Sequence, residues 1–362
     1  MKQNEQGATI NTPDDVTENS IDLQQERKKA KKAFSRFALS IILPLLGANI
    51  VITVLGAIFT NLNMNGAIDQ GFAESTTLSI LISALPMLVF CYPLIFLLTK
   101  KIPSHAPEKK TFKASQWIMF FIITVSAMCI GNYISSFLAA ILTSGQAQNG
   151  LVSTLVSMEI VPIIYTVIIA PIVEELFFRK LLLDKLSGYG EKWAIIFGAL
   201  CFAMFHTNLY QFIYTFGMGL IFGYVYIKSG KIIHTIIMHS GINIIGGVIA
   251  PLAANSLNQE AISELNQLSS QGKEIPAALI ETVLPGLIFY YAFIIMYFGM
   301  VIAGIILFIV NCKKFRTEGS GLLPTAREGV PAILTNAGMI VFIVISALLT
   351  AVNLLAPILS AA

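Results

Sequence analysis

The sequence predicts an all-α, polytopic membrane protein, a bundle of about nine transmembrane helices with eight as the alternative count. Two observations indicate this class. First, 56% of the 362 residues are hydrophobic and only 12% are charged, with a mean hydropathy of +0.76. Soluble domains contain about a quarter charged residues, so a soluble class is excluded. Second, apolar stretches recur that have the ~20 residues a helix needs to cross a bilayer.

The apolar stretches divide the chain into five regions. A polar, basic tail at 1–33, which we expect to be disordered, precedes N-terminal helices within 34–150. A helical core at 160–250 and an extracytoplasmic loop at 251–284 follow, and the C-terminal helices occupy 285–362. The expected spans are 37–60, 77–99, 116–142, 160–183, 193–208, 209–228, 231–250, 285–310 and 333–357.

The distribution of basic residues predicts the orientation of the chain. With nine spans and a cytoplasmic N-terminus, Lys273 alone among the 23 Lys and Arg residues lies outside. This strong bias follows the positive-inside rule and predicts a multi-pass protein of the plasma membrane. The net charge of +3 therefore reflects topology, and we expect the lipid bilayer, not nucleic acid, as a partner.

Three of the expected spans carry polar residues where the bilayer makes them costly. Ionisable groups inside membrane helices are usually paired and functional. The stretches are "IVEELFFR", "FAMFH" and "HSGIN". They contain Glu174, Glu175 and Arg179 in the first, His206 in the second, and His239 and Asn243 in the third.

Spacing and depth suggest that these side chains meet. Residues four apart share a helix face, as His239 and Asn243 do. At about 1.5 Å per residue, Glu174 and His206 lie about 20 Å from the cytoplasmic ends of their spans. On the same scale His239 lies about 12 Å deep and Asn243 about 18 Å deep. We therefore expect a shared, buried cavity near the middle of the membrane.

Each motif also has a purely structural interpretation when it is taken alone. Glu175 and Arg179, at i and i+4, are compatible with an ion pair that only joins helices. A lone His206 is compatible with hydrogen-bonded packing, and "HSGIN" with close helix contact through small residues. The combination of all three favours a functional site.

The three motifs, in this order, resemble the EExxxR, FxxxH and HxxxN (or HxxxB) motifs of the CAAX protease and bacteriocin-processing (CPBP, or Abi) family of intramembrane proteases. The resemblance covers about residues 160–250, which become the expected catalytic core. All motif positions are filled. Lys180 is a departure, because many members have Gly after the Arg.

The resemblance implies an intramembrane endopeptidase that cleaves a membrane-associated protein or peptide with water activated by glutamate and histidine. It implies Glu174 as general base, His206 as its partner in positioning water, His239 and Asn243 as oxyanion stabilisers, and Glu175 with Arg179 as an internal ion pair. The strongly basic flanks and the lack of organelle signals suggest a bacterial plasma membrane, so we do not expect prenylated CAAX proteins as substrates. The resemblance instead implies maturation of a peptide such as a bacteriocin or pheromone, or self-immunity against one.

Three alternatives stay open at this point. No cofactor is favoured, but Glu174, His206 and His239 also form an adequate Zn²⁺ ligand set, although no HExxH is present. A non-catalytic membrane regulator or immunity protein on the same scaffold is the main alternative function. A secondary transporter is less favoured, because its paired repeats are not evident.

Overall fold

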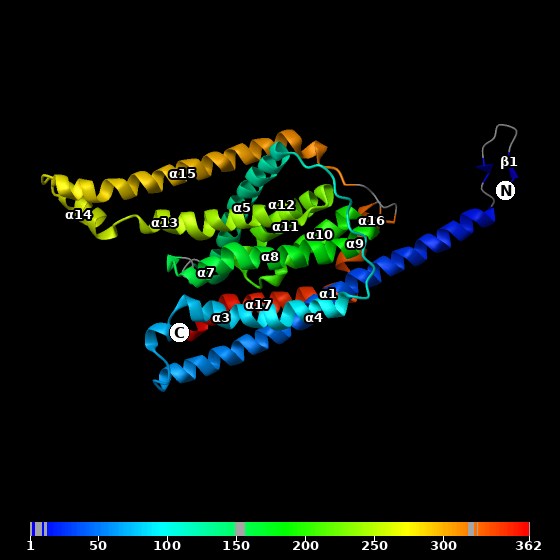
Figure 1. Cartoon of the computed structure of the whole chain (residues 1–362), viewed down its shortest axis with the longest axis horizontal. Helices are drawn as coiled ribbons and strands as arrows, with labels where there is room; N and C mark the ends of the chain where they lie inside the picture. The colour runs from blue at the N-terminus through cyan, green and yellow to red at the C-terminus, as the bar shows by residue number, and fades with distance from the viewer. Residues whose placement is uncertain are drawn as a thin grey trace.

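The computed structural model describes residues 2–3, 9–10, 13–147, 149, 156–317, 322–323 and 325–361. Apart from a short antiparallel pair formed by β1 (Lys2–Gln3) and β2 (Thr9–Ile10), the secondary structure of these residues is helical (Figure 1). Seven helical segments among them are long and apolar enough to cross a membrane. The prediction of an all-α, polytopic membrane bundle is confirmed.

The N-terminal half of the bundle consists of long helices and one interrupted span. Its elements are α1 (Pro13–Met64), α2 (Gln70–Ala73), α3 (Thr76–Pro86), η1 (Met87–Cys91), α4 (Tyr92–Thr99) and α5 (Ala114–Thr143). The catalytic span that we expected is also interrupted. It runs through α7 (Ile160–Ile164), η2 (Tyr165–Ile169), α8 (Ala170–Glu175), η3 (Leu176–Leu181), α9 (Leu182–Leu186) and η4 (Ser187–Tyr189).

The remaining helices complete the bundle. They are α10 (Glu191–Phe205), α11 (Leu209–Ser229), α12 (Ile232–Ile244), η5 (Ile245–Ile249), α13 (Ala250–Asn255), α14 (Gln259–Ser270), α15 (Ala277–Asn311), η6 (Cys312–Lys314), α16 (Ala326–Leu334) and α17 (Ala337–Ala361). In Figure 1, α8 to α12 lie between two flanking groups. One group contains α1, α3, α4 and α17, and the other contains α15.

The expected fifth and sixth spans, 193–208 and 209–228, form α10 and α11, which lie inside the bundle. At 15 residues, α10 is too short to cross a bilayer, and it is buried along most of its length. The 21-residue α11 packs against both α10 and α5. A Cβ at Gly219 would lie 2.6 Å from the Cα of Ala199, so only glycine permits the observed approach of α11 to α10.

The N-terminal tail differs from our expectation of disorder through residue 33, because α1 begins at Pro13. Part of this segment is anchored. Ala30 is fully buried, and Arg27 forms an ion pair with Glu328 of α16 at 3.4 Å. Good helix formers such as Gln, Glu, Lys and Ala dominate the segment, and a terminus that is tied down becomes ordered. The N-terminal part of α1 projects away from the bundle (Figure 1).

Three of the membrane spans contain a π-helical turn that ends two residues before a proline. The pairs are η1 with Pro93, η2 with Pro171 and η5 with Pro251. Proline has no N–H, and its ring clashes with the carbonyl four residues earlier, so the preceding turn widens. In each case the residue just before the proline donates its N–H to the carbonyl five residues back.

Glu159 connects the N-terminal end of the span Ile160–Tyr189 to α3. It occupies the N-cap position of α7. Its carboxylate accepts hydrogen bonds from the backbone N–H groups of Thr76 and Thr77, at 2.9 and 2.8 Å. These groups belong to the first turn of α3, whose N–H groups have no partner within the helix. One carboxylate thus sets the relative height of two spans.

Candidate active site

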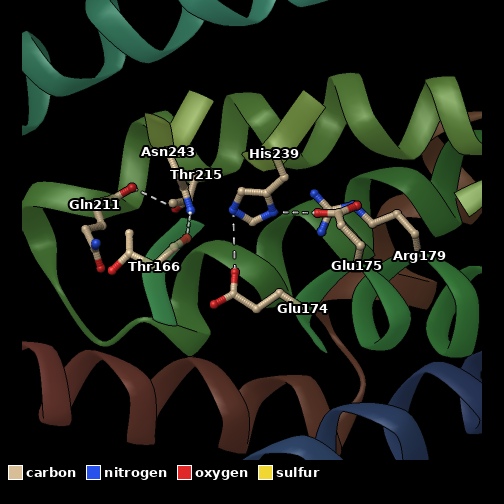
Figure 2. A network of polar contacts seen from close by, with 8 residues as sticks. All are labelled: Thr166, Glu174, Glu175, Arg179, Gln211, Thr215, His239 and Asn243. Carbon is tan, nitrogen blue, oxygen red and sulfur yellow. Dashed lines mark hydrogen bonds and ion pairs between the residues drawn. The ribbon is translucent and has the colours of Figure 1, made fainter. Parts of the chain in front are cut away.

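A buried ion pair lies at the junction of α8 and η3. Nε of Arg179 lies 3.0 Å from Oε2 of Glu175, and both side chains are almost completely buried. The two residues are four apart, so they lie on the same side of the helix (Figure 2). The ion pair expected from the sequence is therefore present in the geometry.

Two aromatic rings complete the surroundings of the guanidinium. Cζ of Arg179 lies 4.5 Å from the ring centroid of Phe202 in α10 and 5.4 Å from that of Phe222 in α11. The two terminal nitrogens of Arg179 have no hydrogen-bond partner among the described residues. Cation–π contact supplies the missing stabilisation, and it is strongest where water is excluded.

His239 connects the ion pair to the second glutamate. Its Nδ1 lies 2.9 Å from Oε1 of Glu175, and its Nε2 lies 3.8 Å from Oε2 of Glu174 (Figure 2). Because Arg179 keeps Glu175 ionised, Glu175 is an acceptor and Nδ1 of His239 carries the proton. The second ring nitrogen, Nε2, is thereby directed at Glu174.

The distance between Glu174 and His239 is too long for a direct hydrogen bond. It is a separation at which one water molecule can bond to both groups after a small adjustment. The Glu174 side chain is 12% exposed, whereas that of Glu175 is 0% exposed. Of the two adjacent carboxylates, Glu174 is thus the one that a reactant can reach.

The amide of Asn243 is held by a carbonyl that the π-helical turn η2 releases. In η2 the N–H of Ala170 donates to the carbonyl of Tyr165, instead of the Thr166 carbonyl of a regular α-helix. The free Thr166 carbonyl accepts a 2.8 Å hydrogen bond from Nδ2 of Asn243 (Figure 2). Since Nδ2 carries two hydrogens, one donor remains for another partner.

His206 lies at a strained corner. It caps the C-terminal end of α10, and the next residue, Thr207, has a positive φ of 45°, which is rare for a β-branched residue. Asn353 of α17 holds this corner by donating to the backbone and hydroxyl oxygens of Thr207, at 3.0 and 3.1 Å. The His206 ring packs edge-on against Phe202, with ring centroids 5.0 Å apart.

The predicted residues thus form two parts in the structure. Glu174, Glu175, Arg179 and His239 form one continuous network, and the ring of Phe202 contacts the imidazoles of both His239 and His206. Asn243 lies beside His239, one turn further along α12. The sequence predicts His206 as the partner of Glu174, and the structure places Nε2 of His239 3.8 Å from Oε2 of Glu174.

Three groups that support the site residues were not predicted from the sequence. They are the carbonyl of Thr166, the side chain of Asn353 and the ring of Phe222. Only the first had a usable signal, because Pro171 lies inside an apolar span and predicts a released carbonyl about four or five residues earlier. The other two depend on contacts between distant helices.

The structure also bears on the zinc alternative. In the part of the chain that it describes, no three His, Cys, Asp or Glu side chains are grouped so that they could hold a metal ion. One nitrogen of His239 is already bonded to Glu175, which leaves only Nε2 as a possible ligand. The predicted ligands Glu174, His206 and His239 therefore do not fit a zinc ion.

A comparison with known protein families finds a match over the segment that carries these residues. Residues 156–245 match the family model for Rce1-like proteins, described as type II CAAX prenyl endopeptidase Rce1-like. The match covers about a quarter of the chain. The match confirms the resemblance and supports a CAAX-type intramembrane protease. Neither a curated protein nor a solved structure matches the chain.

Proposed function

We propose that the chain is an intramembrane endopeptidase that hydrolyses a peptide bond in a membrane-associated protein or peptide. One observation carries the proposal: Nε2 of His239 faces Glu174, while Glu175 and Arg179 hold the ring from the other side. A purely structural ion pair would need Glu175 and Arg179 alone. The second carboxylate and the oriented imidazole are the parts that proton transfer needs.

Charge balance supports a mobile proton in this network. It contains two carboxylates, one guanidinium and one imidazole, and Arg179 balances Glu175. The network as a whole is neutral when Glu174 and His239 together hold one additional proton. Because net charge is costly in a water-poor membrane interior, the neutral state is favoured. The proton then resides on Glu174 or on Nε2 of His239, which lie 3.8 Å apart.

The reaction begins with the proton on His239 and with Glu174 as a free carboxylate. Glu174 accepts a proton from water as the water oxygen bonds to the substrate carbonyl carbon. The carbon–nitrogen bond then breaks, and Glu174 transfers its proton to the leaving amine. General base catalysis of this kind contributes about 10²- to 10⁴-fold to the rate.

Two donors are available for the oxyanion that forms in this step. They are the Nε2–H of the His239 imidazolium and the second amide hydrogen of Asn243, whose first hydrogen is bonded to Thr166. One such donor is worth about 10²- to 10³-fold in kcat. We assign water positioning to His206, because its buried Nε2 has no hydrogen-bond partner among the described residues.

The biological setting is part of the proposal. The basic residues gather in the N-terminal half of α1, in the connections that follow α4, α11 and α15, and on either side of the turn between α9 and α10. This arrangement supports a plasma membrane protein with a cytoplasmic N-terminus. Maturation of a bacteriocin or pheromone, or self-immunity against such a peptide, fits a protease with access to membrane-embedded segments.

The decisive variant is Glu174→Gln, which keeps the shape of the side chain and removes the base. We expect kcat to fall about 10²- to 10⁴-fold with little change in KM. Membrane peptides of wild-type and variant strains, compared by mass spectrometry, identify the substrate for the purified assay. Glu260→Gln in the exposed helix α14 is the control, and it keeps full turnover.

The same variant separates the protease from the non-catalytic regulator. A regulator keeps its phenotype in the Glu174→Gln strain and loses it only on deletion of the chain. Wild-type turnover by purified Glu174→Gln protein would show that this carboxylate is not the base.

A further inference from the structure

A groove separates α4 from the segment formed by η3 and α9. Its volume is about 520 Å³, which lies within the range of small-molecule sites of about 300–1,000 Å³. Its apolar wall includes Phe96 of α4, and Val173 and Leu176 of the catalytic span. Phe96 is 58% exposed and Leu176 is 46% exposed, so the groove opens sideways from membrane-spanning segments.

The polar residues of the groove gather at one of its ends. They are Lys100, Ser104, Lys180, Asp184 and Lys185. The first two follow the last turn of α4, and the other three lie in η3 and α9, which end at the same side of the bundle (Figure 1). The apolar part begins near Tyr92, about 12 Å away along the helix. The groove is therefore apolar over its inner length and basic at its mouth.

The mouth carries an excess of positive charge. Three lysines face one aspartate, and both oxygens of Asp184 are occupied. Oδ2 accepts from Nζ of Lys180 and Oδ1 accepts from the hydroxyl of Tyr226, each at 2.6 Å. Two positive charges remain after this pairing.

Lys185 provides an independent indication of an anion. Its side chain is buried, and its Nζ donates to a neutral partner, the carbonyl of Ile102, at 2.7 Å. The carboxylate next to it, Asp184, is bonded to Lys180 instead. A buried charge is costly unless an opposite charge compensates it. The wall of the groove thus contains a buried cation that an anionic ligand would balance.

We propose that this groove binds an anionic glycerophospholipid. One acyl chain occupies the apolar part beside Phe96 and Leu176, and the phosphate lies at the mouth between Lys100, Lys180 and Lys185. A soluble anion would use only the mouth, whereas the lateral opening and apolar length fit a molecule that is anionic at one end and apolar over the rest. The site does not depend on peptidase activity.

The test uses the full-length protein, purified in detergent and titrated with phosphatidylglycerol or phosphatidylcholine of identical acyl chains. Native mass spectrometry counts the bound lipids. We expect preferential binding of phosphatidylglycerol, weakened about fivefold for each lysine replaced in Lys100→Gln and Lys180→Gln. Lys180→Arg retains the charge and the binding. Lys109→Gln, at an exposed lysine of the neighbouring loop outside the groove, leaves binding unchanged.

Three results would overturn the proposal. The first is equal binding of the two lipids, and the second is equal weakening by Lys109→Gln and Lys180→Gln. The third is displacement of phosphatidylglycerol by an apolar peptide with a free C-terminal carboxylate but not by its amide, which would make the groove a peptide site. Because lipid binding is also measured on Glu174→Gln, failure here is distinguishable from failure of the protease proposal.

Discussion

The span Ile160–Tyr189 contains two ion pairs of the same spacing, one buried at both partners and one with a half-exposed lysine, and they allow a controlled test of the buried network. Glu175 and Arg179 are 0% and 2% exposed in their side chains, whereas Asp184 and Lys180 are 7% and 50% exposed. Removing one partner of a buried pair leaves an uncompensated charge and costs about 3–5 kcal/mol. Loss of a solvent-accessible pair costs about 0–1 kcal/mol.

We therefore expect Glu175→Gln to lower the thermal unfolding midpoint by about 6–10 °C, at about 2 °C per kcal/mol for a chain of this size. Lys180→Gln is the matched control and lowers it by about 2 °C at most. The buried, free thiols of Cys91, Cys129 and Cys201 make a thiol-reactive dye a direct reporter of unfolding.

A double-mutant cycle completes the experiment. Arg179→Met alone leaves the buried carboxylate of Glu175 without its cation. In combination with Glu175→Gln, it leaves no buried charge at this pair. The double variant should be less destabilised than the sum of the single variants, by about 1–3 kcal/mol. If Glu175→Gln and Lys180→Gln have equal effects, or if the two buried substitutions are additive, the ion pair is not what determines stability here.

Two further variants test the backbone and the outer end of the span. Pro171→Ala restores a backbone N–H and a regular helical turn, so we expect unchanged or higher thermal stability. Cleavage should be slower, because Asn243 loses the free Thr166 carbonyl. A normal kcat would show that the widened turn does not contribute to catalysis. For Glu159, hydrogen bonds led by that from the Thr77 side chain lower its pKa from 4.5 to about 2. Its stabilisation is thus full above pH 4.5 and is lost as pH falls toward 2, so the midpoint difference from Glu159→Gln should be constant near neutrality and shrink in acid.

The sequence predicts the membrane class, which the structure confirms, because hydropathy is a local pattern. The polar residues were also selected from local motifs, and their functional role stays a prediction. Hydropathy identifies apolar segments, and the i, i+4 spacing places Glu175 with Arg179 whatever the rest of the bundle does. The same pattern does not distinguish a lipid-facing helix from one buried in protein. For this reason 193–208 and 209–228 are helices as expected, but α10 and α11 lie in the interior.

The pairing of residues between helices could not be predicted in the same way. Which imidazole faces Glu174 depends on how α12 and α10 are rotated and on the strained corner at Thr207, which Asn353 holds from the other end of the sequence. Hydropathy carries no information on rotation about the helix axis. His239 rather than His206 therefore emerged opposite Glu174 only from the structure.

The distribution of satisfied and unsatisfied polar atoms supports the proposed position of the reaction. In a membrane interior each polar group needs a partner within the protein. Glu175 has two partners, Arg179 and His239, and Asn243 has the carbonyl that η2 releases. Spare hydrogen-bonding capacity remains at Glu174, which lies 3.8 Å from His239. It also remains at the buried Nε2 of His206. The terminal nitrogens of Arg179 also lack hydrogen-bond partners among the described residues, but its ion pair and the rings of Phe202 and Phe222 surround them. In the proposed mechanism the reacting water and peptide therefore lie on the Glu174 side of the imidazole.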